Sequence, residues 1–284
     1  MAERADPWAR WVLRPENELE SMQPTRDRVL ANAGVGPGDV LLDVGCGSGL
    51  IALGAVPLVG DEGGVIFSDV SETLLEHCRR EAAEREVADR CRFIVASADN
   101  LVGVDDESVD AVTTRSVLIY VKDKAQAFRE LFRVLRPGGR VSIFEPINSF
   151  DYPWPPERFF GYDVTPVVDL VRKVMSIYDR LQPPEDPMLD FDERDLLRHA
   201  EAAGFVDIHL ALEATIGSQP WARGPWEAFL RTTGNPCVPP LEEVLDEALT
   251  EAEKERLRAH LQPLVERGEG ENRMALAYLW ALKP

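Results

Sequence analysis

The sequence lacks the features that mark membrane, secreted and metal-binding proteins. No apolar run approaches the roughly 20 residues that a membrane-spanning helix needs, and residues 1–10 lack the apolar core of a signal peptide. The four cysteines form no C-x-x-C pair, and no histidine stands at a zinc-like spacing from them. We therefore expect reduced thiols, no metal site, no membrane insertion and a cytoplasmic location.

Positive charge is also scarce. The chain has 31 lysines and arginines against 50 acids, which gives a formal net charge of -19. This charge repels phosphate backbones, and the sequence contains no basic stripe, so we expect no nucleic-acid partner. The acidic run at residues 242–255 is interpreted as the solvated face of a helix.

The most informative segment is residues 40–50, with the sequence V-L-L-D-V-G-C-G-S-G-L. Glycine has no Cβ and tolerates positive φ, and a helix that follows such a turn offers free N–H groups in its first turn. The segment therefore predicts a buried strand that ends at a ligand-binding turn, although loops also collect glycine for conformational reasons alone. A dinucleotide fingerprint would place the third glycine one position later.

Alternating strands and helices surround this turn. Such alternation predicts a mostly parallel sheet, with ligands bound at the carboxyl ends of its strands. A helix at 193–203, a strand at 206–215 and a closing strand at 273–282 complete the pattern. The other expected strands are 40–44, 64–68, 91–96, 109–114 and 140–145, and the expected helices between them are 49–58, 72–86 and 124–135.

The strand, acid and glycine arrangement resembles motif I of the class I S-adenosylmethionine-dependent methyltransferases, in particular the quinone-biosynthetic (UbiE-like) and natural-product enzymes that act on small molecules. The resemblance covers residues 38–146 well and the two final strands loosely. It implies an α/β fold: a Rossmann-like, seven-stranded, mostly parallel sheet with an antiparallel last strand and helical cap insertions. It also implies S-adenosyl-L-methionine as cofactor, held by a loop that contains Asp43, Gly45, Cys46, Gly47 and Gly49.

Three further motifs are expected to complete the cofactor site. Asp69, in F-S-D-V with Val70, is placed to accept the ribose hydroxyls, although it could instead be a turn residue before Ser71. Arg115 and Ser116 follow the fourth strand, where the family lines the methionine end of the cofactor. The L-R-P-G-G-R segment at 135–140 resembles a common later motif of the family.

The adenine contact departs from the family pattern. Relatives place an acid followed by alanine after the third strand, whereas this chain has Ser97, Ala98 and Asp99. Either Ser97 makes a neutral hydrogen bond to the adenine, or Asp99 reaches it.

The resemblance also suggests how the chain is divided. We expect a cofactor-binding core at residues 37–146, completed by 191–216 and 272–284. The remaining segments are interpreted as an N-terminal helical cap at 1–36, a cap insertion at 147–190 and a second helical insertion at 217–271.

The caps are rich in aromatic residues that could form a substrate pocket. If they converge they would suit a flat or lipophilic small molecule, and otherwise they pack the extra helices onto the core. The candidate pocket residues are Trp8, Trp11, Tyr152, Trp154 and Tyr162, and Trp221 and Trp226 lie in the second helical insertion.

No catalytic residue is assigned. Methyl transfer gains chiefly from alignment and exclusion of water, so a nucleophilic acceptor needs no dedicated base. Glu145, Tyr152 and His209 could take a proton, but each also reads as a structural or pocket residue.

The leading hypothesis is methyl transfer from S-adenosylmethionine to a hydrophobic or aromatic small molecule, with a second copy of the chain as a further partner. The alternatives are a cofactor-binding protein without transferase activity and a nicotinamide-dependent oxidoreductase, which the glycine spacing disfavours. Charge argues against methylation of RNA and the caps against bulky protein substrates. Arsenite methylation would need several convergent thiolates, and the cysteines are scattered.

Overall fold

The structure is a computed structural model that describes residues 6–14, 19–183, 185–218, 220 and 222–284. The chain divides into two compact units. The first contains Met1–Ile147, Phe191–Leu212 and Leu276–Pro284, and the second contains Asn148–Asp190 and Glu213–Ala275. Trp221, one of the candidate aromatics, lies outside the described residues.

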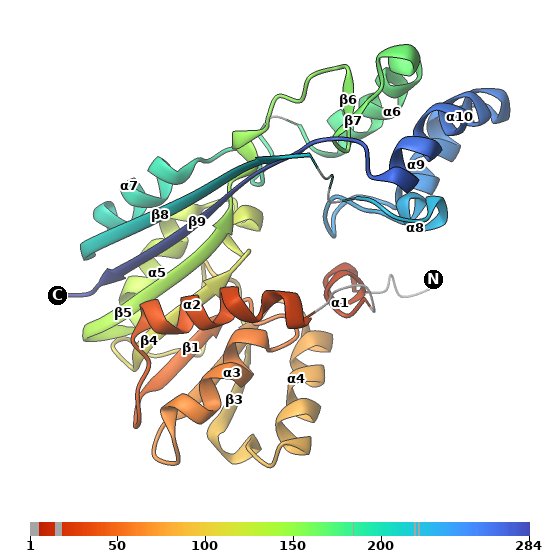
Figure 1. The fold of residues 1–284 in the computed structure, drawn as a ribbon. Helices are drawn as coiled ribbons and strands as arrows, with labels where there is room; N and C mark the ends of the chain where they lie inside the picture. The colour runs from red at the N-terminus through yellow and green to blue at the C-terminus, as the bar shows by residue number, and fades with distance from the viewer. Residues whose placement is uncertain (1–5, 15–18, 184, 219, 221) are drawn as a thin grey trace. The chain divides into compact units, whose positions relative to one another are not determined.

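A seven-stranded sheet forms the centre of the first unit, with the strand order β3-β2-β1-β4-β5-β9-β8 (Figure 1). β1 is parallel to β2 and β4, whereas β9 is antiparallel to β5. This confirms the predicted fold class, because chain order reverses between β1 and β4 and only the last strand inverts direction. The strands are β1 Val40–Val44, β2 Gly64–Asp69, β3 Cys91–Val95, β4 Val109–Arg115, β5 Leu135–Pro146, β8 Val206–Gly217 and β9 Asn272–Leu282.

Helices cover both faces of this sheet. On one face α2 (Gln23–Ala33), α3 (Leu50–Val59) and α4 (Glu72–Glu84) share a hydrophobic core with β1 and β2. On the other, α5 (Lys124–Val134) packs against β5 and α7 (Glu193–Ala203) (Figure 1). α3 is apolar along its whole length, as expected for a helix packed between α2 and α4. A short helix, α1 (Pro7–Val12), precedes α2.

The largest shift from a predicted boundary is at Leu135. The helix expected to include Leu135 ends at Val134, and β5 begins at Leu135 instead of Arg140. Pro137 disfavours helical backbone at the residue before it and cannot continue a helix. The chain therefore becomes extended at once, and Leu135 pairs with Val109 of β4.

The second unit has a hydrophobic core of its own. The acidic run at 242–255 belongs to two helices, and Thr250 caps the second one through a reciprocal pair of hydrogen bonds with Glu253. Among the described residues, no helix of either unit is long and apolar enough to cross a membrane. The elements are β6 Arg158–Phe159, β7 Tyr162–Asp163, α6 Val168–Leu181, α8 Trp226–Leu230, α9 Leu241–Ala248 and α10 Glu251–Arg267.

Candidate cofactor site

The glycine loop after β1 has the backbone that the sequence predicts. Gly45, Gly47 and Gly49 have φ values of +66°, +55° and +82°, in the region that side chains with a Cβ rarely adopt. A Cβ on Gly45 would overlap the side chain of Val117. One on Gly49 would lie 3.0 Å from Cδ1 of Leu53. These two glycines are therefore required by packing inside the unit.

Gly47 differs from its two neighbours. An ideal Cβ on Gly47 would meet only Val12 of α1, at 3.5 Å from Cγ1, which is ordinary van der Waals contact. No side chain from the sheet or from the helices that cover it crowds this position. Of the three glycines, Gly47 is thus the one that leaves its backbone open on the outer side of the loop.

Asp43 supports the loop from beneath. Its carboxylate accepts a hydrogen bond from Thr113 Oγ1 at 2.8 Å and one from the backbone N–H of Ala52 at 3.2 Å. The residue is only 1% exposed, and burial raises the pKa of Asp43 to about 7. Asp43 therefore joins β1 to β4 and to the start of α3, and it shapes the loop without facing its open side. Thr113, which the sequence analysis did not single out, is its partner.

Asp69 connects the end of β2 to the same loop. One carboxylate oxygen accepts the N–H of Gly47 at 2.9 Å, and the other accepts the N–H of Ser71 at 2.9 Å. Burial raises the pKa of Asp69, and these backbone N–H groups lower it. The turn interpretation is thus confirmed by the bond to Ser71. A carboxylate offers about four acceptor sites, and the contact of Asp69 with ribose hydroxyls stays a prediction.

In the loop after β3, the two candidates for the adenine contact, Ser97 and Asp99, are hydrogen-bonded to each other. The hydroxyl of Ser97 donates a hydrogen bond to the carboxylate of Asp99, and the N–H of Asn100 donates to the carbonyl of Ser97 at 3.0 Å. Ala98 between them is buried. Because its proton is engaged with Asp99, the oxygen of Ser97 is oriented as an acceptor. Val70, which follows Asp69, is 52% exposed.

Arg115 ends β4, near enough to the buried carboxyl groups of Asp43 and Glu145 to interact with them electrostatically. Burial lowers the pKa of the Arg115 guanidinium, and both carboxyl groups oppose this shift. Ser116 has a positive φ of 55°, and its N–H donates to the carbonyl of Phe144 at 2.8 Å. The chain turns sharply here, which places a cation at the carboxyl end of β4.

Glu145 is a structural anchor and offers no free base. Its carboxylate accepts the N–H groups of Val117 at 2.9 Å, Leu118 at 2.8 Å and Ile119 at 3.3 Å. It is fully buried, and burial raises the pKa of Glu145 to about 7. The sequence could not separate this role from a catalytic one, because both place an acid at the end of β5.

The four cysteines differ in burial, since Cys91 is half-buried and Cys237 is exposed. Cys46 and Cys78 are both buried, and the hydrogen bond between their thiols, together with burial, raises the pKa of Cys46. Cys78 Sγ also contacts the carbonyl oxygen of Gly47 at 3.3 Å. All four cysteines have free thiols. Within the described part of the chain, no cluster of three or more His, Cys, Asp or Glu residues could hold a metal ion.

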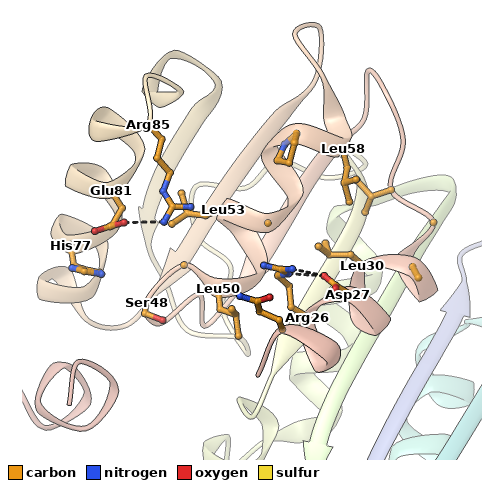
Figure 2. A pocket seen from close by; sticks show the side chains of 17 residues that line it. Arg26, Asp27, Leu30, Ser48, Leu50, Leu53, Leu58, His77, Glu81 and Arg85 are labelled. Carbon is orange, nitrogen blue, oxygen red and sulfur yellow. Dashed lines mark hydrogen bonds and ion pairs between the residues drawn. The ribbon is translucent and has the colours of Figure 1, made fainter. Parts of the chain in front are cut away.

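A groove of about 1060 Å³ lies on the helical surface of the first unit, between α2, α3 and α4. Figure 2 shows ion pairs between Arg26 and Asp27 and between Arg85 and Glu81 along its sides. The groove reaches the cofactor loop only at Ser48 and Gly49, and neither Gly47 nor Asp69 lines it. It is therefore separate from the strand-end site.

The structure divides the candidate substrate-pocket residues among different environments. Trp8 and Trp11 lie on α1 of the first unit. In the second unit, Tyr152 packs edge-on against Trp154, with ring centroids 5.4 Å apart, and Trp154 is 43% exposed.

The prediction for Tyr162 is contradicted. This residue is completely buried in the core of the second unit, and its hydroxyl donates to the carbonyl of Ala222 at 2.8 Å. Trp226 is buried in the same core. His209, a candidate base, lies on β8 and stacks on Trp280 at 5.1 Å. Tyr162 and Trp226 therefore contribute to packing, not to a pocket.

The residues at the strand ends fit the cofactor that the resemblance implies. Gly47 leaves open a space that any Cβ would narrow, Asp69 brings a carboxylate to the same loop, and Val70 exposes an apolar side chain beside it. Ser97 and Asp99 supply polar atoms one strand further along the sheet. Together they offer acceptors for a diol and an amine and an apolar surface for a purine ring.

Comparison with known proteins agrees with this geometry. A methyltransferase-domain family model matches residues 42–143. The chain is 35% identical over 185 residues to the ubiquinone/menaquinone biosynthesis C-methyltransferase UbiE of Idiomarina loihiensis, covering 62% of this chain and 70% of that protein. The crystal structure of a putative methyltransferase from Bacillus halodurans shares the fold, with a TM-score of 0.55 at 19% identity, over 92% of this chain and 99% of that one.

The match to other relatives is shorter. The UbiE protein of a Marinomonas species is 34% identical over 116 residues, which is 41% of this chain and 46% of that protein. The chain thus spans about half the length of several curated relatives that it matches. The part that the family model matches contains the glycine loop and the carboxyl ends of β1, β2, β3 and β4. The chain therefore belongs to the class I S-adenosylmethionine-dependent methyltransferase family, whose cofactor is S-adenosylmethionine.

Proposed function

We propose that the chain transfers a methyl group from S-adenosylmethionine to a hydrophobic or aromatic small molecule. The observation that carries the proposal is the strand-end site, where Gly47, Asp69 and Ser97 present complementary groups on three neighbouring loops. Membership of the methyltransferase family argues against the alternative hypothesis of a nicotinamide-dependent oxidoreductase.

Each loop would hold one part of the cofactor. Asp69 would accept the ribose hydroxyls while keeping its bond to Gly47, and Val70 would pack against the adenine ring. Ser97, oriented by Asp99, would accept a hydrogen bond from the adenine amino group. Arg115 would attract the carboxylate of the methionine end. When bound, the cofactor supplies an electrophilic methyl group on a sulfonium centre.

The acceptor is proposed to be nucleophilic without help from a dedicated base. Glu145 has both oxygens engaged by backbone N–H groups, and His209 is stacked on Trp280. Acceleration would then come from alignment of acceptor and methyl group and from exclusion of water.

Three observations support a small hydrophobic acceptor. The relatives from Idiomarina and Marinomonas are named for C-methylation in ubiquinone and menaquinone biosynthesis. The second unit exposes Trp154 and Phe150, 43% and 36% of whose surfaces remain accessible. The net charge of -19 disfavours a polyanion such as RNA. Cytoplasmic location and homodimer formation stay predictions.

Titration calorimetry tests the cofactor site. We expect S-adenosylmethionine to bind the wild-type chain, and Asp69→Ala combined with Gly47→Val to weaken binding by about tenfold or more, since loop geometry and a charged acceptor are lost together. Asp61→Ala, in the exposed turn before β2, is the matched control. Absence of wild-type binding, or equal binding by the double variant, would contradict the proposal.

A second assay separates transfer from binding alone. Release of S-adenosylhomocysteine is measured with phenols, quinones and amines as acceptors. Turnover with a lipophilic member of the panel supports the proposed reaction. Tight cofactor binding with no turnover on any acceptor would instead favour a binding protein without transferase activity.

A further inference from the structure

The two edges of the seven-stranded sheet differ in length and in chemistry. One edge is β3, a strand of five residues that carries the exposed charge of Arg92. The other is β8, a strand of 12 residues that lies beside β9 (Figure 1). Among the described residues, no strand follows β8 in the sheet. The outer edge of β8 therefore presents a row of backbone N–H and C=O groups to which no strand is paired.

The sequence of β8 lacks the features that usually protect an outer edge. Natural edge strands are blunted by short length, by proline or by charged residues, lysine above all. β8 contains no lysine, arginine or proline. It exposes large apolar side chains instead, with Val206 41%, Leu212 41% and Ile216 60% exposed. A long apolar edge of this kind is a template for pairing with another strand.

The side chains of β8 alternate in character. Its only described residue with a positive φ is Asp207, at the start of the strand, so the regular part begins at Ile208. Because successive side chains of a strand point to opposite faces, one face from there onward is apolar and the other is mostly polar. The apolar set is Ile208, Leu210, Leu212, Ala214 and Ile216, and the set between them is His209, Ala211, Glu213 and Thr215.

This pattern matches itself when two copies of β8 pair in antiparallel fashion. A two-fold axis through Ala211, the middle of the strand, sets each residue opposite the one equally far beyond Ala211 in the second copy. Leu210 then faces Leu212 of the second copy on the apolar face. On the polar face His209 faces Glu213 of the second copy, which sets an imidazole against a carboxylate.

The charge of the chain favours the same register. Two copies with a net charge of -19 repel each other, so a surface on which they associate needs few acids. β8 has two, Asp207 and Glu213. With the axis at Ala211 neither of them faces an acid, whereas an axis one residue earlier would set Asp207 against Glu213. An axis one residue later would set His209 against Thr215 and lose its pairing with the carboxylate.

We propose that β8 is the interface of a homodimer, in which the outer edges of two copies pair about a two-fold axis at Ala211 and join the two sheets into one. The occupant of the edge is a second copy of this chain, because the strand complements itself in both its apolar and its charged positions. The residues of the proposed cofactor site follow β1, β2, β3 and β4, so the interface does not depend on that site.

Sedimentation equilibrium of the full-length chain over the micromolar range tests the interface. We expect a species with twice the 31.7 kDa mass of one chain. Leu212→Lys sets a charge against Leu210 of the second copy and should raise the dimer dissociation constant by about tenfold or more. Leu58→Lys on α3 is the matched control, since Leu58 is 42% and Leu212 41% exposed, and it should leave the constant unchanged. Circular dichroism checks that both variants are folded.

Three results would overturn the proposed dimer. The first is a wild-type chain that stays monomeric over the whole range. The second is a dimer that a folded Leu212→Lys variant leaves intact. The third is a dimer that Leu58→Lys disrupts to the same extent, because the two copies would then meet on another surface.

A charge exchange tests the register. His209→Glu sets two carboxylates against each other and should weaken the dimer by about three- to tenfold, and adding Glu213→Lys should restore it to within about twofold of the wild type. Both variants lose the stacking of His209 on Trp280, so this loss cancels in the comparison. Residues 209 and 213 of one strand lie roughly 13 Å apart, so a rescue acts between copies. Absence of either the weakening or the rescue would overturn the pairing about Ala211.

Discussion

Replacement of Glu145 by glutamine should remove a defined part of the pH dependence of stability. The carboxylate is fully buried and serves as the acceptor for the N–H groups of Val117, Leu118 and Ile119. Burial raises the pKa of Glu145 from 4.5 to about 7 in the folded chain. Glutamine has nearly the same shape and keeps a carbonyl acceptor, but it does not ionise.

The raised pKa determines the direction of the effect. Because the folded chain binds the proton of Glu145 more tightly than the unfolded chain, this contribution to stability is complete below pH 4.5 and is lost as pH rises toward 7. For a shift of this size, the free energy of unfolding falls by about 2 kcal/mol between pH 5 and pH 7, and by about 3 kcal/mol in total. Glu145→Gln lacks this contribution at every pH.

Urea denaturation followed by circular dichroism at pH 5, 6, 7 and 8 measures the difference. We expect the unfolding free energy of wild type minus that of Glu145→Gln to decrease by about 2 kcal/mol between pH 5 and pH 7. Glu62→Gln, on an exposed turn, provides the baseline for loss of one acidic group. A wild-type-minus-variant difference that stays constant across this range would refute the assignment of a buried carboxyl that changes ionisation on unfolding.

Four other substitutions test the loop and the two cores. Gly45→Ala should lower the free energy of unfolding by about 3 kcal/mol and abolish cofactor binding, because the added methyl group overlaps Val117 and the φ of Gly45 is positive. Gly47→Ala has only the cost of a positive φ and should lower the free energy of unfolding by about 1–2 kcal/mol. Thermal unfolding measures the stability of both variants, and calorimetry measures their cofactor binding. Thr113→Val removes a donor from the buried acid of β1 and should cost about 1–3 kcal/mol in urea denaturation at pH 7, and unchanged stability would contradict this. Tyr162→Phe should cost about 1 kcal/mol while leaving the calorimetric affinity for S-adenosylmethionine unchanged, whereas weaker binding would return Tyr162 to the site.

Local sequence signals were sufficient for most of the secondary structure. The bounds of β1 and α7 agree with the prediction, and the left-handed backbone of Gly45, Gly47 and Gly49 was expected from their residue type. These features depend on hydrophobic patterning, capping residues and steric preferences, all of which act over a few neighbouring residues. The helix boundary near Leu135 was less accurate, since pairing with Val109 from another part of the chain extends the strand.

The roles of individual site residues depended on the tertiary structure. Asp43 and Glu145 are acids at strand ends in the sequence, yet both are buried anchors. Their partners, Thr113 for Asp43 and the N–H groups of residues 117–119 for Glu145, lie 26 to 70 residues away. Tyr162 belongs to a loop rich in aromatics, and only the packing of the second unit shows that it is a core residue. Hydrogen-bond partners distant in sequence leave no local pattern from which such roles could be predicted.

The sequence by itself determined the parallel sheet, the ligand-binding turn and, through the resemblance, the identity of the cofactor, because strand periodicity and glycine spacing are properties of short segments. Only the tertiary structure decided which glycine faces outward and what lies on it. Gly45, Gly47 and Gly49 are the same residue type at equal spacing in the sequence. The space around each one differs because folding brings side chains from α1, α3 and the turn after β4 next to them. The contact of Val12 with Gly47 is of this kind, since it joins segments that neither capping nor periodicity relates.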